Sequence, residues 1–502
     1  MKKKKGLIWN FQNLYTFTLS KYLQENYDCV LYSIYDVPDN LKKTFQEQSV
    51  VKYEKSWYFF DHIKNVQREP DLEYLKSIEK KYGIKLWLLA INERFFYQFN
   101  YYRFSSNEVL LILEQTCKLF EKILNEIKPD FVIIEQPFFS YQQIFYEICK
   151  NQNVNVLILN SNRFNNGFYI SSEIDRFDDR KISMKDSGKS RTKEQLLEYI
   201  ENKTLIKTTN FQKSQVLTSR SESIRGFFNF IFSNNSNTKT HFTYYGRTKF
   251  KVILNKIIIE IQTKYRKGFY EKNSIKEIKD GAKFIFYPFS IDMESSLLMW
   301  TPFYTNQLEL VKNIARSLPV GYELYVKEHP FSYTRGWRNI SYYKQIMDLP
   351  NVRLIHTSAN SDEIIKKCSL VITIAGSAGL QAAFQNKPSI IFADVSYSSL
   401  PSVYRLNSFE ELPQAIRESL QKKVDSSELS KFIQFIEKTS FEFDYLDPLI
   451  EVDEFYDKGI FSNNLLTIEN IESCLEKNKQ VFDMLALEHI KKINELKNII
   501  SN

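Results

Sequence analysis

Short apolar segments that alternate with amphipathic helical segments dominate the chain from residue 281 to about residue 420. The apolar segments are too short for buried helices and are rich in β-branched and aromatic residues, so each predicts a buried strand. Alternation of such strands with helices predicts a parallel sheet that is covered by helices on both faces. The predicted strands lie at 283–290, 321–330 (with its loop), 352–356, 370–377 and 387–394, and the helices at 305–318, 361–369, 378–386 and 408–420.

The first third of the chain carries a similar alternation, which predicts a second doubly wound α/β unit. A charge-rich, helical stretch interrupts it up to about residue 90. The predicted strands lie at 6–10, 29–36, 128–136 and 154–160, and the helices at 14–26, 108–127 and 141–153.

The remaining segments lack strand periodicity. Residues 174–280 combine polar stretches with amphipathic, basic helical segments at 223–232 and 250–272, and the residues after 425 are helical in pattern. We expect these amphipathic helices to pack against their own domain, with contact to a membrane surface as the alternative. The chain is therefore divided into an α/β domain (1–173), an insertion with a helical connector (174–280), a second α/β domain (281–425) and a helical tail (426–502).

Composition limits the class of protein. The 502 residues are 43% hydrophobic, which fits a folded protein, and the net charge of +8 favours anionic ligands or an anionic membrane surface. The basic residues are dispersed and no nucleic-acid-binding motif occurs, so a nucleic-acid partner is not expected. The five cysteines are scattered and never form a CxxC pair, and no signal peptide or transmembrane segment is recognised, so a cytoplasmic location is predicted.

A glycine- and serine-containing turn follows the strand at 370–374, in the sequence TIAGSAGLQAA (373–383). Gly376 and Gly379 allow close approach to the backbone, and Ser377 is placed either to cap the following helix or to face a ligand. A helix N-terminus at this point favours an anion such as a phosphate. The turn lacks the GxGxxG pattern, so a dinucleotide cofactor is disfavoured.

Two basic side chains stand at the end of an earlier strand, in LYVKEHP (324–330). Lys327 supplies a positive charge, and His329 supplies a donor that can become cationic beside a phosphate. A diphosphate-linked sugar donor needs such groups opposite its leaving group, where negative charge develops as the glycosidic bond breaks. The sequence therefore predicts a phosphate-binding site between these two strand ends.

The motif YVKEHP, followed by CSLVITIAGSAGLQAAFQNKPSIIF, resembles the donor domain of the capsule polysaccharide biosynthesis glycosyltransferases, a group that includes bacterial Kdo transferases. The resemblance covers about residues 281–420. It implies a GT-B fold, in which two Rossmann-like domains face a central cleft, with the acceptor on the first domain and a nucleotide-sugar on the second. It also implies inverting chemistry without a metal or other cofactor.

The resemblance also assigns roles to residues. Lys327 and His329 would meet the donor phosphate, and Gly376 and Ser377 would line the phosphate turn. Many family members carry a glutamate where this chain has Gln381, which can bond hydroxyl groups but lacks a carboxylate's charge.

An inverting transferase also needs a base for the acceptor hydroxyl. Glu135, at the end of a first-domain strand, and Glu294, after the first strand of the second domain, are the predicted candidates, and Asp292 is similarly placed. Histidines and carboxylates show no metal-ligand spacing, so no metal site is predicted.

The predicted function is transfer of a sugar from a CMP- or UDP-linked donor to a growing surface or capsular polysaccharide, with a glycan or lipid-linked glycan as acceptor. Contact with the inner face of the membrane is left open. Two alternatives remain. One is a polyol-phosphate transferase of the teichoic-acid type. The other is a non-catalytic subunit of a capsule assembly complex, which the replacement of the family's glutamate by Gln381 allows.

Overall fold

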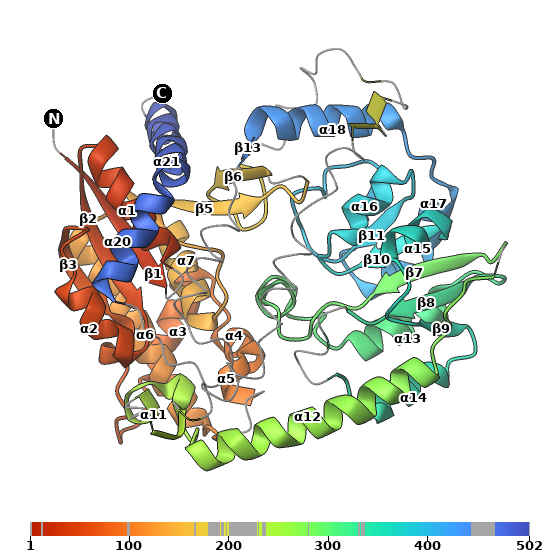
Figure 1. Cartoon of the computed structure of the whole chain (residues 1–502), viewed down its shortest axis with the longest axis horizontal. Helices are drawn as coiled ribbons and strands as arrows, with labels where there is room; N and C mark the ends of the chain where they lie inside the picture. Colours follow the sequence, from red (N-terminus) through yellow and green to blue (C-terminus); the bar gives the residue numbers. More distant parts are fainter. Residues whose placement is uncertain are drawn as a thin grey trace.

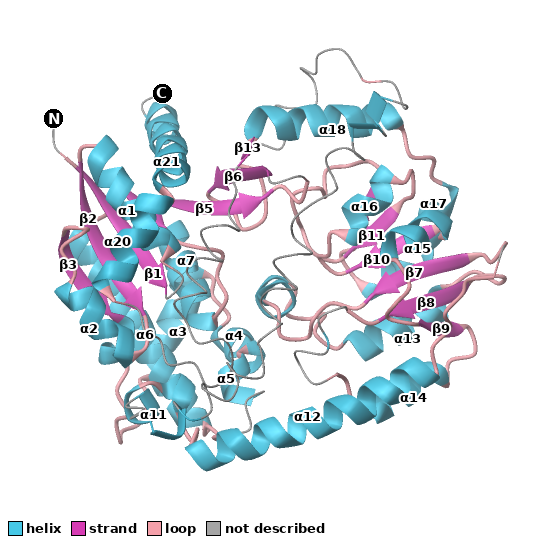
Figure 2. Cartoon of the chain, viewed as in Figure 1, coloured by secondary structure: helices cyan, strands magenta, loops and turns pink. Residues whose placement is uncertain are grey.

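The chain folds into two lobes, each built around a β-sheet (Figure 1). The computed structural model describes residues 3–11, 14–97, 101–164, 167–178, 191, 195–196, 198–199, 228, 230–232, 237–279, 281–329, 332, 337–442 and 467–500. Figure 2 shows the two sheets well apart, with helices packed around each. The predicted GT-B class, α/β with two doubly wound Rossmann-like sheets, is confirmed by these two sheets.

The first sheet has the strand order β13-β6-β5-β4-β1-β2-β3. Its central strands are parallel, while β6 and β13 extend it with antiparallel pairing. The strands are β1 (Lys4–Phe11), β2 (Cys29–Asp36), β3 (Tyr53–Tyr58), β4 (Phe131–Ile133), β5 (Asn155–Ser161), β6 (Gly167–Ser171) and β13 (Phe441–Glu442).

The second sheet is parallel throughout, with the order β12-β11-β10-β7-β8-β9. All its strands therefore end at one edge. The strands are β7 (Phe284–Pro288), β8 (Glu323–Lys327), β9 (Val352–Ile355), β10 (Leu370–Thr373), β11 (Ser389–Ile391) and β12 (Val403–Arg405).

Helices cover both sheets. Those of the first lobe are α1 (Tyr15–Asn26), α2 (Asp39–Glu47), α3 (Leu72–Tyr82), α4 (Leu86–Asn92), α5 (Arg94–Tyr97), α6 (Ser106–Ile127), α7 (Ser140–Asn151) and α11 (Asn237–Thr240). Those of the second lobe are α13 (Gln307–Ser317), α14 (Ile340–Met347), α15 (Ser361–Lys367), α16 (Ala378–Phe384), α17 (Leu412–Gln421) and α18 (Ser426–Thr439). Helix α6 has 22 residues, and a capping box at Ser105 and Glu108 fixes its start.

The C-terminal segment returns to the first lobe. Helices α20 (Ile468–Lys477) and α21 (Lys479–Ile500) bury Ile471 and Phe482 in the same core as Phe17 of α1, and the short strand β13 pairs with β6. The tail therefore completes one face of the first sheet. The four-part division of the chain itself stays a prediction.

A single long helix, α12 (Lys249–Lys272), runs from one lobe to the other along one edge of the molecule (Figure 1). It matches the helix predicted at 250–272. Of its side chains only Val252 and Tyr270 are buried, so packing against its own domain accounts for just part of its apolar surface. The predicted polar stretches between 179 and 236 lie almost entirely outside the described residues, as does most of the helical segment at 223–232.

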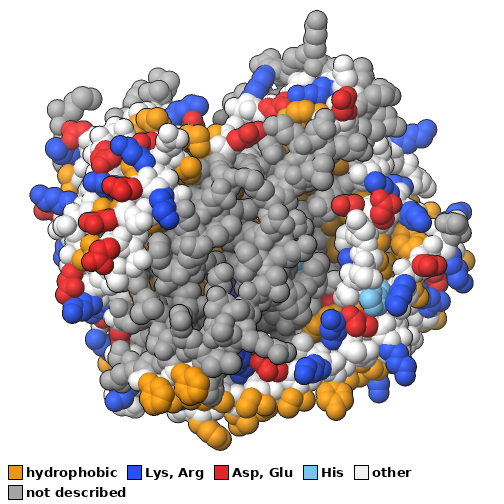
Figure 3. Space-filling model, viewed as in Figure 1, with side chains coloured by type: hydrophobic (Ala, Val, Ile, Leu, Met, Phe, Trp, Pro, Cys, Tyr) orange, Lys and Arg blue, Asp and Glu red, His pale blue; other side chains and the backbone are white. Residues whose placement is uncertain are grey.

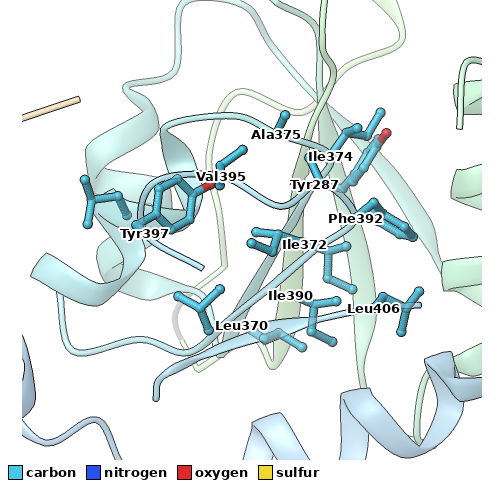
Figure 4. Close-up of a cluster of buried hydrophobic side chains, with 14 of the residues drawn as sticks. Tyr287, Leu370, Ile372, Ile374, Ala375, Ile390, Phe392, Val395, Tyr397 and Leu406 are labelled. Atoms are coloured by element: carbon cyan, nitrogen blue, oxygen red, sulfur yellow. The ribbon is translucent and has the colours of Figure 1, made fainter. Parts of the chain in front are cut away.

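The core of the second lobe lies directly beneath the carboxyl edge of its sheet. Figure 4 shows Ile372 and Ile374 packed with Ile390, beside the ring of Tyr397, and all four side chains are buried. This core fixes the backbone that leads into the turn after β10. Within the described ranges, no helix is both long and apolar enough to cross a membrane.

The elements that were not predicted include β3, β6, β12, β13 and α14. Strand β3 reads YEKSWY and buries only Trp57 fully, because it is the edge strand of its sheet and carries solvated charges. Strand β6 depends on antiparallel pairing with β5, which no local periodicity reveals.

Candidate functional site

Two of the predicted strand ends lie at the same edge of the second sheet. Strands β8 and β10 are both parallel neighbours of β7, and Lys327 is paired with Pro288 at the end of that strand. Because neighbouring strands are about 4.8 Å apart, the ends of β8 and β10 lie on the order of 10 Å apart. Lys327 and the turn that holds Gly376 are therefore brought to one edge.

Lys327 points to the face of the sheet that α15 and α16 cover. Tyr325, two residues earlier on the same face, packs with Ile364 of α15 and Ala382 of α16. Lys327 is 5% exposed, and its ammonium donates a hydrogen bond to Ser361 Oγ at 2.9 Å. Burial lowers the pKa of Lys327, and the charge of Asp362 opposes this. An anion at this edge would restore the solvation that the ammonium has lost.

His329 is partly buried just beyond the strand end. Its pKa is lowered to about 4, chiefly by burial and also by the cations Arg338 and Lys327, while the charge of Glu328 opposes the shift. The imidazole is therefore neutral at pH 7, which refines the prediction of a cationic donor. A phosphate placed beside it would favour the protonated form.

Glu328, between these two residues, is a buried carboxylate that holds the strand end in place. Its Oε1 accepts from Ser332 Oγ at 2.8 Å and from Arg338, and its Oε2 accepts from Tyr343 at 2.6 Å. The Tyr270 hydroxyl of α12 accepts from its backbone N–H at 3.0 Å. Pro330, the last residue of the motif, lies outside the described residues.

The two carboxylates after β7 differ in their surroundings. Asp292 Oδ1 accepts from Arg338 at 2.8 Å and from Gln307 Nε2 at 2.5 Å, so it anchors the Glu328–Arg338 pair. Glu294 is exposed and starts a π-helical turn, η3 (Ser296–Trp300), whose Leu298 and Met299 are buried in the core of the first lobe. Glu294 thus lies where the chain crosses between the lobes.

The turn after β10 is built by close backbone contacts. The Gly376 carbonyl accepts from the Tyr397 hydroxyl at 2.5 Å, and its N–H donates to Thr373 Oγ1 at 3.3 Å. A Cβ at Gly376 would lie 2.7 Å from Thr373 Oγ1, and one at Gly379 would lie 2.7 Å from the Tyr397 oxygen. Both positions therefore require glycine for close approach.

Ser377 is exposed at the start of the seven-residue helix α16, and its side chain makes no capping hydrogen bond. Of the two predicted roles, capping is thus not observed. Gln381 lies one turn further along α16 and is partly buried, and its N–H donates to the Ser377 carbonyl at 2.9 Å.

The carboxyl edge of the first sheet carries a pair of acidic residues. Glu135 follows β4 and is partly buried, whereas Asp36, the last residue of β2, is 4% exposed. Burial raises the pKa of Asp36 to about 7, and hydrogen bonds from Tyr141 and Gln142 oppose the shift. The charge of Glu135 adds to it, so the two carboxyls lie close enough to interact. The sequence analysis missed Asp36, although its position at the end of CVLYSIYD was the available signal.

Arg163, in the loop after β5, joins the edges of the two sheets. Its guanidinium donates to the carbonyl oxygen of Ala375 and forms an ion pair with the buried Asp175. Asn160 Oδ1 accepts from the Asp175 N–H at 2.8 Å and from Gln136 Nε2 at 2.7 Å. A continuous set of hydrogen bonds therefore runs from the residue after Glu135 to the residue before Gly376.

Part of the chain matches a family model. Residues 185–418 match the model described as capsule polysaccharide biosynthesis protein. This confirms the predicted family resemblance. The matched residues include those predicted for the donor site: Lys327, His329, Gly376, Ser377 and Gln381.

The solved structures that match the chain have low identity and low TM-scores. Thermosulfurimonas dismutans KpsC, a beta Kdo 2,7 transferase, is 13% identical over 72% of this chain and 86% of its own, with a TM-score of 0.29. The S. aureus MnaA–UDP structure is 11% identical over 90% of this chain and 96% of its own, with a TM-score of 0.24. A Methanocaldococcus jannaschii UDP-GlcNAc 2-epimerase is 12% identical over 87% of this chain and 99% of its own, also with a TM-score of 0.24. A search of curated proteins finds no match to the sequence. The match to the family model supports a role in capsule polysaccharide biosynthesis.

Proposed function

We propose that this chain transfers a sugar from a nucleotide-sugar donor to a growing capsular or surface polysaccharide, by an inverting mechanism without a metal. One observation carries the proposal: Lys327 and Ser377 lie at the same edge of the second sheet. The Lys327 ammonium has lost solvation through burial, and the exposed Ser377 hydroxyl makes no capping hydrogen bond. A leaving nucleotide phosphate at this edge would add negative charge beside the buried ammonium of Lys327, on which Asp362 already acts.

In the proposed donor site each residue has a separate task. Lys327 stabilises the charge that develops on the leaving phosphate. His329, neutral in the free protein, donates a hydrogen bond and gains a proton as negative charge builds beside it. The backbone at Gly376 and the hydroxyl of Ser377 contact the phosphate, and Gln381 bonds a hydroxyl of the sugar or ribose.

Glu135 is the proposed base that takes the proton of the acceptor hydroxyl as the new bond forms at the anomeric carbon. Its neighbour Asp36, with a pKa raised to about 7 by burial, would act as a neutral positioning group at the same edge. Glu294, exposed where the chain crosses between the lobes, is the second proposed base. The acceptor, a glycan or lipid-linked glycan, would bind on the first lobe, at the inner face of the membrane.

A thermal-shift panel tests the donor site. We expect CMP- or UDP-sugars to raise the melting temperature, and Lys327→Ala or His329→Ala to abolish the shift. Lys344→Ala, which removes an exposed lysine of α14 in the same lobe, is the matched control and should keep it. Stabilisation by CDP-glycerol or CDP-ribitol instead would favour a polyol-phosphate transferase. The proposed donor site is wrong if no nucleotide stabilises the protein.

A further inference from the structure

Helix α12 is held rigidly to both lobes on its inner side. Near its start, Asn255 donates to the Tyr101 hydroxyl of the first lobe at 3.1 Å. Towards its end, Arg266 donates to the Trp337 carbonyl at 3.0 Å and Tyr270 to the Ile355 carbonyl at 2.6 Å, both in the second lobe. With 24 residues the helix is about 36 Å long, so it forms a straight, anchored edge of the molecule.

The outer side of α12 carries large apolar side chains in contact with solvent, which we call the apolar stripe. At 100° per residue, its members fall within an arc of about 100° on one side of the helix. Their exposures range from 41% to 75%, which is unusual for so many large apolar groups on one element. The members are Phe250, Leu254, Ile257, Ile258, Ile261 and Tyr265. Figure 3 shows hydrophobic side chains gathered along this edge of the molecule.

Basic residues dominate the rest of the helix. Seven of its 24 residues are lysine or arginine and two are glutamate, and one of these, Glu271, is paired with Lys267 at 3.7 Å. Lys251 and Lys264 are exposed at the two borders of the apolar stripe. An apolar stripe bordered by exposed lysines is the pattern of a helix that lies in the headgroup region of an anionic bilayer.

We propose that the apolar stripe of α12 docks the protein on an anionic lipid surface, with the helix axis parallel to the membrane plane. The stripe enters the boundary of the acyl chains, with an aromatic ring near each end, and the lysines reach the phosphate headgroups. Charge decides between this occupant and a second copy of the chain. Pairing two copies through this face would bring two strongly basic helices together, whereas an anionic bilayer complements them. This surface does not depend on the proposed sugar-transfer chemistry.

Docking along α12 has a consequence for the donor edge. The same Tyr270 that anchors the helix accepts the N–H of Glu328, next to Lys327 and His329. The donor edge is thereby held at a fixed place relative to the membrane plane, as an enzyme acting on lipid-linked glycans would need.

Co-sedimentation with vesicles tests the proposal without any donor or acceptor. We expect the full chain to bind phosphatidylcholine vesicles that contain phosphatidylglycerol, to bind pure phosphatidylcholine much more weakly, and to be released by salt. The double variant Leu254→Gln/Ile261→Gln should bind more than about tenfold more weakly, since it removes two central members of the stripe. Leu72→Gln/Met347→Gln, which changes exposed apolar residues on α3 and on α14, is the matched control and should bind like the wild type.

Circular dichroism and the melting temperature should be unchanged in both variants, because the replaced side chains are exposed. The proposal is overturned if the full chain does not bind anionic vesicles. It is equally overturned if Leu254→Gln/Ile261→Gln binds them as well as Leu72→Gln/Met347→Gln does. It is also overturned if the wild type is a dimer that the α12 variant converts to a monomer, because a second copy would then cover the stripe.

Discussion

The guanidinium of Arg163 donates a hydrogen bond to the backbone carbonyl of Ala375, so a loop of the first lobe directly supports the glycine turn of the second. The same guanidinium lies over the ring of Tyr397, whose hydroxyl bonds the Gly376 carbonyl. Two successive carbonyl groups of the turn are therefore held by one arginine and its stacked tyrosine. The geometry of the proposed phosphate turn thus depends on contact between the lobes.

Replacing Arg163 should destabilise the protein and distort the turn. Arg163→Ala leaves the buried Asp175 without its cation, and breaking one side of a buried ion pair typically costs about 3–5 kcal/mol. Urea unfolding of Arg163→Ala measures this loss, and Arg163→Ala/Asp175→Ala should recover part of it. Arg353→Ala, which removes an exposed pair with Glu323, is the control and should change stability by about 1 kcal/mol or less. A loss that small for Arg163→Ala would contradict the supporting role.

His329 should be neutral in the free protein and should titrate near pH 4. Because its folded pKa lies below the ordinary value, the native state resists protonation, and stability is lost as the pH falls from about 6.5 towards 4. This loss should amount to at most about 3 kcal/mol, and His329→Gln should remove it.

Two-dimensional NMR of the imidazoles checks the assignment. The signal that disappears in His329→Gln should titrate near pH 4 in the free protein and at higher pH when CMP or UDP is bound. An unchanged titration in the presence of bound nucleotide would place the phosphate away from His329. His489→Gln is the control, since that buried histidine of α21 also has its pKa lowered to about 4 but lies in the first lobe.

The strands that were predicted correctly are those made almost entirely of buried apolar residues. All four residues of β10 are buried, and so are most of β1 and β8, so their apolar runs mark strands without further information. Strand β13 is only two residues long and pairs with a strand more than 270 positions earlier, which local periodicity cannot encode. The return of the C-terminal helices to the first lobe was missed for the same reason.

In the candidate site, too, some residues could be predicted from the sequence and others could not. That Lys327, His329 and the glycine turn lie at one edge could be predicted, because parallel strands end at the same edge of a sheet, a rule that needs only the strand assignments. Their part in binding a donor stays a prediction. The supporting pairs Arg338–Glu328 and Arg163–Asp175 were missed because each residue alone looks like an ordinary surface charge. Only the folded chain buries these charges and brings them together.

Asp36→Asn should stabilise the protein at alkaline pH. Since the folded pKa of Asp36 is about 7 and the unfolded one about 3.8, the native state favours the protonated carboxyl, and stability falls as the pH rises from about 4 to 7. The neutral amide avoids this loss, so the variant should gain up to about 4 kcal/mol at pH 8 and almost nothing at pH 4.

Urea unfolding at several pH values measures the Asp36 effect, with Asp348→Asn, an exposed site after α14, as the control. A gain that is independent of pH would mean that Asp36 is ionised throughout the range. Turnover then separates the two acidic residues. If Glu135 is the base, Glu135→Gln abolishes transfer, while Asp36→Asn retains transfer but loses any pH dependence near 7.

Gln381→Glu should increase the affinity for a ligand that carries hydroxyl groups. The side chain lies one turn beyond Ser377 on α16, and a carboxylate at this position would form charge-assisted hydrogen bonds, which are roughly twice as strong as neutral ones. The matched control is Gln414→Glu on α17, an exposed position in the same lobe whose amide contacts only Glu418 among the described residues. We expect calorimetry to show tighter binding of a nucleotide-sugar by about fivefold to tenfold in Gln381→Glu and no change in the control.

If the wild type binds the donor without transferring it and Gln381→Glu begins to transfer, the natural chain is a binding subunit. If the variant instead binds more weakly, the carboxylate lies beside the donor phosphate, and Gln381 is part of the phosphate site.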